Sequence, residues 1–370
     1  MKKQLSIAAV LLSLCVLFSG CSSPSAAGTA AGSDIPSGLY LYAQYEAYVE
    51  ASGSASEDQD PSKVSDFLKA SVTTEEGAEP IKVSDFVAGR TEETLRSYYA
   101  VEALFDELGG TLTEDRLREA DSAADRELQA RGEEYSANGI GEQTLRLVQR
   151  NAVKRSMLPE LLYGKNGRSP VSDEELSAYI QNDMFYGIYV NVPLYSTATF
   201  VPADEAQRTE MLRLAGEAAA GFSERIRSAI RPGDPDTALP HFYSELYEDL
   251  PGIYKAMNVD YDPSALSGEL NTELFTVSDL TEYFGEETAN SLSMMEYGDA
   301  TAFTYNDFGM LIMLRADPLA SQSLDDIRGV VLSRMKSEDT QKELDDRAAS
   351  LELSLNSGST QKLPASKIRF

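Results

Sequence analysis

The sequence predicts an α+β fold that is mainly helical. Apolar residues recur at helical spacing through most of 35–182, which predicts amphipathic helices joined by short links. An aromatic and β-branched run replaces this pattern at 186–192, and such a run is typical of a strand. Residues 302–305 and 310–315 are expected to be two strands joined by the turn residues at 306–309. Helical periodicity returns at 324–355. We therefore expect an α+β segment with helices before and after it.

The clearest helix of the first part is expected at 91–108. Its apolar stripe consists of Leu95, Tyr98, Val101, Phe105 and Leu108. Gly109-Gly110 would end it, because glycine readily adopts the backbone conformation that closes a helix. Further along, Ser172 and Glu175 have the spacing of a capping box, which predicts the start of a short helix there.

The first twenty residues have the parts of an export signal. Lys2 and Lys3 begin it, an apolar run covers 5–18, and a Ser-Gly pair precedes Cys21. The run is shorter than the roughly 20 apolar residues of a membrane-spanning helix, and its charged start is typical of a secretion signal. The junction resembles the lipobox of bacterial lipoproteins. This resemblance implies a signal peptide at 1–20, cleavage before Cys21 and lipid attachment to it; the alternative is an ordinary signal peptide.

The rest of the chain divides into a tether and three folded parts. Residues 22–33 are all Ser, Ala, Gly, Pro or Thr, so we expect a flexible tether at 21–34. A helical domain is expected at 35–182 and an α+β domain at 183–320. The last part, 321–370, is expected to be a helix that packs on the first domain.

Charge restricts the possible partners. The chain has 60 acidic and 32 basic residues and a net charge of −28, so binding of nucleic acid through a broad basic surface is not expected. The same charge repels anionic lipid headgroups. Membrane attachment should therefore depend on the lipid on Cys21 rather than on a basic face.

Cysteine and histidine usage restricts the chemistry. Cys15 would leave with the signal and Cys21 would be acylated, so no thiol remains for catalysis, redox function or a zinc site. His241 is the one histidine, and its apolar and aromatic neighbours favour packing over catalysis. The acidic pairs at 234–236 and 260–262 lack the pattern of a calcium loop. We expect no metal and no cofactor.

Three stretches of sequence resemble the PrsA- and SurA-type extracytoplasmic foldases. Residues 107–114 resemble the helix junction of their N-terminal domain, and 170–179 resemble the helix that leads into their parvulin domain. Residues 297–300 and 308–312 resemble the end of that domain. The resemblance implies a chaperone module of N- and C-terminal helices with a parvulin-like domain inserted. Such a module would bind unfolded or newly secreted polypeptides without ATP.

The parvulin-like part departs from the pattern of active isomerases, which usually have histidines in the first and last strands. The first strand, 186–192, has none, and Leu311 stands where the last-strand histidine would fall. Met294, Phe303 and Phe308 are candidates for a remnant proline pocket, although such residues near strands are more often core. We therefore expect a degenerate parvulin domain.

The leading hypothesis is a lipid-anchored extracytoplasmic chaperone. One alternative is an active parvulin-type prolyl isomerase. A second is the solute-binding lipoprotein of a transporter, which would need repeated strand–helix units in two α/β lobes. The helical pattern of 35–182 disfavours that second alternative.

Overall fold

The computed structural model describes residues 24–74, 79–196, 199–229, 251–252, 254 and 271–370. The chain forms two compact units, which we call the helical unit (Met1–Ser169 with Lys336–Phe370) and the sheet unit (Pro170–Met335). The described residues are mainly helical with antiparallel sheets, so the predicted α+β, mainly helical fold class is confirmed.

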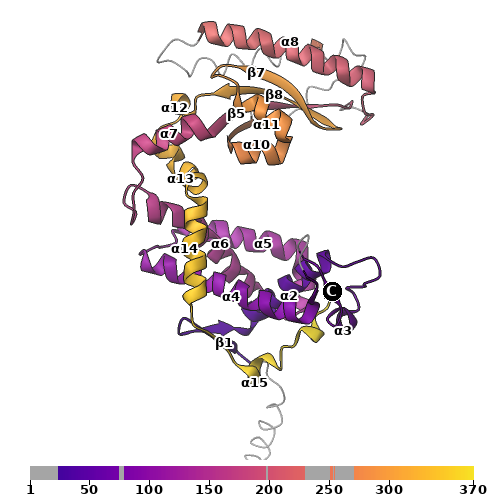
Figure 1. The fold of residues 1–370 in the computed structure, drawn as a ribbon, viewed down its shortest axis with the longest axis vertical. Helices are drawn as coiled ribbons and strands as arrows, with labels where there is room; N and C mark the ends of the chain where they lie inside the picture. Colours follow the sequence, from indigo (N-terminus) through magenta and orange to yellow (C-terminus); the bar gives the residue numbers. More distant parts are fainter. Residues whose placement is uncertain (1–23, 75–78, 197–198, 230–250, 253, 255–270) are drawn as a thin grey trace, which may run out of the picture. The chain divides into compact units, whose positions relative to one another are not determined.

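The helical unit is built on amphipathic helices. Its helices are α2 (Ser37–Gly53), α3 (Val64–Phe67), α4 (Val83–Glu107), α5 (Glu114–Ala137), α6 (Glu142–Tyr163), α14 (Ser337–Ser350), α15 (Ser357–Thr360) and the 3₁₀ turn η2 (Ala365–Lys367). The expected stripe on α4 is largely buried: Leu95, Val101 and Phe105 are in the core. α14 lies along α4 and α6 (Figure 1) and adds Leu344 to the cluster that those helices form.

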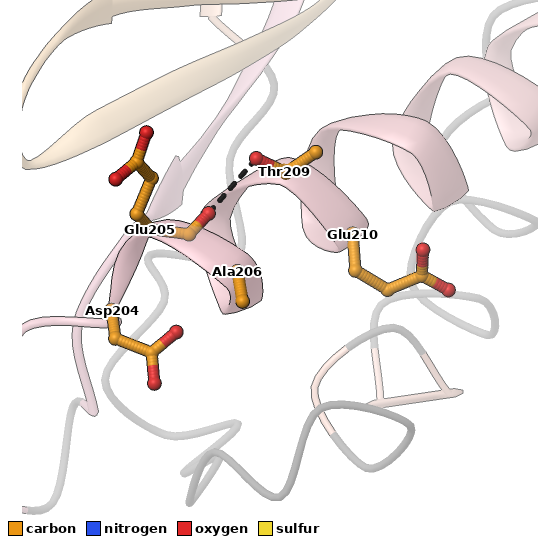
Figure 2. A pocket seen from close by; sticks show the side chains of 5 residues that line it. All are labelled: Asp204, Glu205, Ala206, Thr209 and Glu210. Atoms are coloured by element: carbon orange, nitrogen blue, oxygen red, sulfur yellow. Dashed lines mark hydrogen bonds between the residues drawn. The ribbon is translucent and has the colours of Figure 1, made fainter.

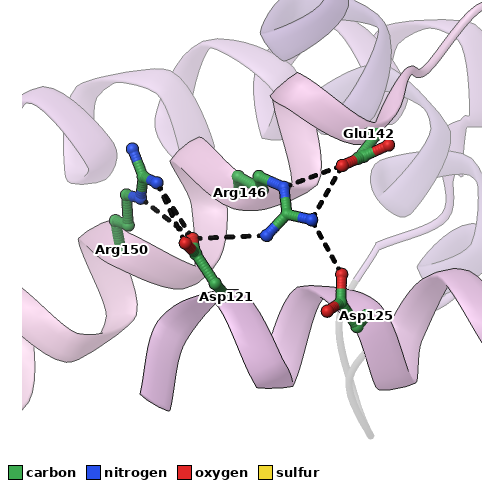
Figure 3. A network of polar contacts seen from close by, with 5 residues as sticks. All are labelled: Asp121, Asp125, Glu142, Arg146 and Arg150. Atoms are coloured by element: carbon green, nitrogen blue, oxygen red, sulfur yellow. Dashed lines mark hydrogen bonds and ion pairs between the residues drawn. The ribbon is translucent and has the colours of Figure 1, made fainter. Parts of the chain in front are cut away.

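Ion pairs join α5 to α6 (Figure 3). Arg150 of α6 donates to both carboxylate oxygens of Asp121, at 3.0 and 3.3 Å. Arg146 contacts Asp125 at 2.9 Å and Glu142 at 2.7 Å. Exposed ion pairs each contribute little to stability, so this network fixes the register of the two helices more than it stabilises them.

The segment that was expected to be a flexible tether is partly structured. Within 21–34, residues Ala26–Ala30 form β1, and β2 (Ser33–Pro36) begins there. The physical reason is non-local pairing: β1 lies between β2 and β9 (Leu353–Leu355) in one antiparallel sheet. Small residues allow this close packing, and Ala27 and Ala30 are fully buried. A second, two-stranded ladder pairs β3 (Ser71–Val72) with β4 (Ile81–Lys82).

The sheet unit has four antiparallel strands in the order β6-β5-β8-β7. The strands are β5 (Met184–Pro193), β6 (Asn271–Thr276), β7 (Ala300–Asn306) and β8 (Gly309–Ala316), and the helices are α7 (Asp173–Asp183), α8 (Glu205–Ala229), α10 (Val277–Phe284), α11 (Glu286–Ser293), α12 (Pro318–Ser321) and α13 (Leu324–Met335). The described sheets are all antiparallel, whereas the two α/β lobes of a solute-binding lipoprotein would need repeated strand–helix units.

Alternation along the strands gives the sheet two apolar faces, each covered by helices (Figure 1). Ile188 and Val190 of β5 and Ile312 of β8 pack with Met211 and Phe222 of α8. The opposite face packs with α10 and α11. Its buried members are Phe185, Phe275, Leu280, Ala289, Leu292, Leu311 and Met313. This second face positions the candidate site.

The single helix expected at 324–355 is two helices followed by a strand. α13 ends at Met335 and packs with α7 in the sheet unit. α14 begins at Ser337 and packs in the helical unit, and β9 follows it. The apolar residues of this stretch therefore pack into two separate cores. Their helical spacing continues through the stretch, so the sequence does not show where α13 ends and α14 begins.

Candidate functional site

Several residues singled out in the sequence lie outside the described part of the chain. These are the signal peptide at 1–20, Cys21, His241 and the acidic pairs at 234–236 and 260–262. Lipid attachment to Cys21 therefore stays a prediction.

The three candidates for a proline pocket lie in different surroundings. Met294 follows α11 and is 84% exposed, and Phe308 in the β7–β8 turn is 59% exposed. Phe303 of β7 packs against Phe284, with ring centroids 5.2 Å apart. The three side chains do not form one enclosed pocket, because two of them project largely into solvent.

The sheet face that packs with α10 and α11 carries a group of partly exposed aromatic and polar side chains. We call it the tyrosine face, and it consists of Tyr189, Glu273, Tyr283, Phe303 and Tyr305. Strand pairing explains part of its composition. Alternate residues of a strand point to the same side, so Tyr189 shares this side with buried Phe185, and Glu273 shares it with buried Phe275.

The hydroxyl group of Tyr189 is the central polar group of this face. It donates to Oε2 of Glu273 at 3.3 Å. Burial raises the pKa of Tyr189 above its usual value, and the negative charge of Glu273 raises the pKa further, with smaller contributions from Tyr283 and Tyr305. The Tyr189 hydroxyl therefore keeps its proton over the physiological range and acts as a hydrogen-bond donor.

Aromatic rings connect the strands and the helix beneath this face. The Phe275 ring lies 6.2 Å from Tyr283 and 5.9 Å from Phe284, both in edge-to-face geometry. Tyr189 lies 6.5 Å from Phe275. Edge-to-face pairs stabilise such clusters beyond their buried area, so the partly exposed ring of Tyr283 is presented on a rigid support.

The polar groups of the face are tyrosine hydroxyls and the carboxylate of Glu273. Leu311, at the position expected for a histidine, is 3% exposed and belongs to the apolar core beneath. The described side chains of the face include no imidazole or thiol. Among the described residues no cluster of acidic, histidine or cysteine side chains could hold a metal ion. None of the described helices is both long and apolar enough to cross a bilayer.

A groove lies in the helical unit, between α2, α4 and α6. Its volume is about 280 Å³. It is lined by Leu39, Tyr42, Arg90, Thr94, Leu95, Ser97, Tyr98, Val101, Val148, Asn151 and Arg155. Burial raises the pKa of Tyr42 to about 12. The lining of the groove therefore combines apolar side chains with tyrosines, as the tyrosine face does.

Of the tyrosine face, only Phe303 is a candidate residue from the sequence. The sequence predicts a strand over 186–192, but no local pattern marks Tyr189 within it. Strand β6 was not expected, and Glu273 was missed with it. The alternation of Asn271, Glu273 and Phe275 before a Thr-x-x-Asp capping box is the signal that could have located this strand.

Comparisons with known proteins give similarities only to solved structures. No family model matches the chain, and no curated protein matches it. Among solved structures, the chain is similar to the crystal structure of foldase protein PrsA from Streptococcus pneumoniae. The identity is 14% and the TM-score is 0.34, over 76% of this chain and 93% of that chain. A similarity at this identity and TM-score does not show that the two proteins share a function.

Proposed function

We propose that the chain is a foldase-type chaperone that binds unfolded or newly exported polypeptides without ATP. The tyrosine face is the observation that carries this proposal, because it combines exposed rings and hydroxyl groups with no imidazole or thiol. Tyrosine supplies large, rigid contact area at low entropic cost. These properties suit polypeptide clients of many sequences. The short motifs that resemble extracytoplasmic foldases agree with the same function.

Suppression of aggregation tests the proposal. The mature chain, added in near-stoichiometric amount to a reduced model protein, should suppress aggregation of that protein. Tyr283→Ala/Tyr305→Ala should weaken suppression several-fold, because both side chains are partly exposed and contribute binding area rather than core. Val330→Ala on α13 is the matched control, since Val330 is also about half exposed. A folded wild-type chain that suppresses nothing would contradict the proposal.

We also propose that the chain acts outside the cytoplasm, attached to the membrane by lipid on Cys21. The support is the three-part leader and the residues that precede the cysteine. A Cys21→Ser chain should fail to incorporate labelled fatty acid and should leave the membrane fraction. Membrane association that survives Cys21→Ser would show that something other than this lipid attaches the chain.

Prolyl isomerisation is the alternative activity, and the hydroxyl of Tyr189 beside Glu273 is the feature that favours it. We expect a tetrapeptide isomerisation assay to give only the uncatalysed rate. A rate above background that Tyr189→Phe abolishes would replace the binding proposal with a catalytic one.

A further inference from the structure

Two loops meet at one end of the sheet, where β5 ends and β8 begins. Pro193 and Gly309 are paired there, and the backbone N–H of Leu194 donates to the carbonyl oxygen of Phe308 at 2.9 Å. The chain after β5 and the β7–β8 turn therefore lie side by side. They form one surface of the sheet unit.

This surface presents apolar side chains to solvent. Phe200 is 74% exposed, Val201 is 61% exposed and Phe308 is 59% exposed. Single exposed apolar residues are ordinary, whereas a group of them marks an interaction site. We call these three residues the apolar tip.

The backbone at the apolar tip is held in an unfavourable conformation. Phe200 has φ +56°, in the left-handed region that bulky residues rarely adopt. Ser196, which is buried, fixes it: the N–H of Phe200 donates to the Ser196 carbonyl at 2.7 Å, and the N–H of Ser196 donates to the Val201 carbonyl at 2.9 Å. The ring of Tyr195 stacks on Phe200 with centroids 6.1 Å apart. These local contacts hold Phe200 in a backbone conformation that phenylalanine rarely adopts, and its ring stays exposed. Strained residues of this kind cluster at functional sites.

Acidic side chains lie at the base of the apolar tip, since Asp307 precedes Phe308 in the chain and Asp204 follows Val201 by three residues. Asp204, Glu205 and Glu210 project from the start of α8, directly after the loop (Figure 2). Asp307 adjoins Phe308 and is largely exposed, and Arg208 approaches it to only 3.8 Å. Arg213 pairs with Glu210, so four carboxylates stand against two guanidinium groups here, in a chain whose net charge is −28. An anionic membrane surface is repelled by this rim, whereas a polypeptide with basic residues is attracted.

We infer that the apolar tip and its acidic rim dock polypeptide segments that combine apolar with basic side chains. The inference rests on the proposed function and names the class of client segment for it. Apolar client side chains contact Phe200, Val201 and Phe308, and flanking Lys or Arg side chains pair with the rim carboxylates. Electrostatic complementarity of this kind determines partner choice more than total affinity.

Peptide binding to the full mature chain tests the inference. Three labelled peptides share one apolar centre and carry basic, neutral or acidic flanks. The basic-flanked peptide should bind about tenfold more tightly than the acidic-flanked one, and raising the salt concentration should reduce this difference because salt screens exposed charges. Equal affinities for the three peptides would overturn the inference.

Two sets of variants test whether the peptides bind at the apolar tip and its acidic rim. Phe200→Ser/Phe308→Ser should weaken binding of all three peptides, and Asp204→Asn/Glu205→Gln/Asp307→Asn should remove the preference for basic flanks. Val330→Ser is the control, because it removes another apolar side chain of the sheet unit that is more than half exposed. All changed residues are exposed, and thermal unfolding followed by circular dichroism checks that the fold persists. Peptide binding that is unchanged in the first two variants would refute the assignment.

Other occupants of the surface give different results. Binding to neutral phosphatidylcholine vesicles that Phe200→Ser/Phe308→Ser abolishes would assign the apolar tip to a membrane and overturn the inference. If the wild-type chain is a dimer and the same variant is a monomer, the apolar tip is a self-association surface. That result would also overturn the inference. If aggregation is suppressed normally by this variant and no peptide preference exists, the inference fails while the proposed function stands. If the wild-type chain suppresses no aggregation, the proposed function fails first.

Discussion

At the scale of single residues, one tyrosine hydroxyl lies between two carboxylates. The hydroxyl of Tyr135 on α5 is 3.2 Å from Oε1 of Glu46 and 2.7 Å from Oε1 of Glu127. The guanidinium of Arg131 lies 4.8 Å from the centre of the Tyr135 ring. A tyrosine hydroxyl has one proton to donate, so it cannot satisfy two ionised carboxylates at once. Burial raises the pKa of Glu46, and the pairing with Arg131 only partly opposes that shift.

This arrangement predicts a stability that depends on pH. Because the pKa of Glu46 is higher in the folded than in the unfolded chain, its contribution is full below the unfolded pKa of about 4.3 and is lost as pH rises through the folded pKa. Glu46→Gln should therefore be more stable than wild type at neutral pH, and the difference should vanish near pH 4. Urea unfolding at the two pH values measures it. Glu119→Gln, which removes an exposed carboxylate paired on the same helix with Arg116, should show no such pH-dependent gain.

Sequence patterns identified individual residues only where the signal was local. Ser172 and Glu175 form the expected capping box, since four consecutive residues contain all the required groups. Tyr189 and Glu273 are 84 residues apart, and only strand pairing brings them together. Most of the candidate site could not be read from the sequence for this reason.

At the scale of elements, a glycine determines how closely two strands approach. A Cβ added at Gly28 of β1 would lie 2.2 Å from the carbonyl oxygen of Ser354 in β9. Gly28→Ala should therefore separate β1 from β9 and destabilise the helical unit by about 1–3 kcal/mol. Amide hydrogen exchange of Leu353–Leu355 should accelerate. Gly53→Ala is the control, because nothing lies within 4 Å of a Cβ added there. Unchanged exchange in Gly28→Ala would contradict the prediction.

The start of α7 gives a second prediction at this scale. The hydroxyl oxygen of Ser172 accepts from the N–H of Glu175 at 3.2 Å, and the Glu175 carboxylate accepts from the N–H of Ser172 at 3.0 Å. Ser172→Ala should cost about 1 kcal/mol of stability. Ser172→Thr retains the hydroxyl and should recover most of the loss. Thermal unfolding of the three chains decides, and a Thr variant as unstable as the Ala variant would show that the cap is not the cause.

Helices were predicted better than strands. Each helix from α4 to α8 has an apolar periodicity contained within its own sequence. The strands β1, β2 and β9 carry no strand pattern of their own, because each is short and forms only when residues 26–30 and 353–355 meet. In 324–355, the periodicity continues across the break between α13 and α14, so a single long helix was expected.

At the scale of the whole molecule, the helical unit needs both ends of the chain. Its residues up to Ser169 are completed by Lys336–Phe370. Leu344, Leu351 and Leu363 of that last segment are buried in its clusters. Losing a buried leucine side chain costs about 2–5 kcal/mol, so losing three approaches the roughly 5–15 kcal/mol of a whole domain.

Truncation after Met335 should therefore unfold the helical unit and leave the sheet unit folded. Calorimetry of the intact chain should show the transitions of both units, and the truncated chain should lose one. The segment 170–335 expressed alone is the control and should unfold cooperatively, because its clusters are formed by its own residues. A truncated chain that retains full helical signal and both transitions would contradict this account.

Composition and local sequence pattern predict the fold class, the main helices, the capping box of α7 and the scarcity of histidine and cysteine. These features depend on composition or on residues close together in the chain. The tertiary structure decided that part of the expected tether is a strand pair, that the last helix divides between two units, and that Tyr189, Glu273, Tyr283 and Tyr305 share one face. It also decided that Phe200 and Phe308 lie at one end of the sheet. Non-local strand pairing brings these residues together, and no local sequence pattern specifies which distant strand is the partner.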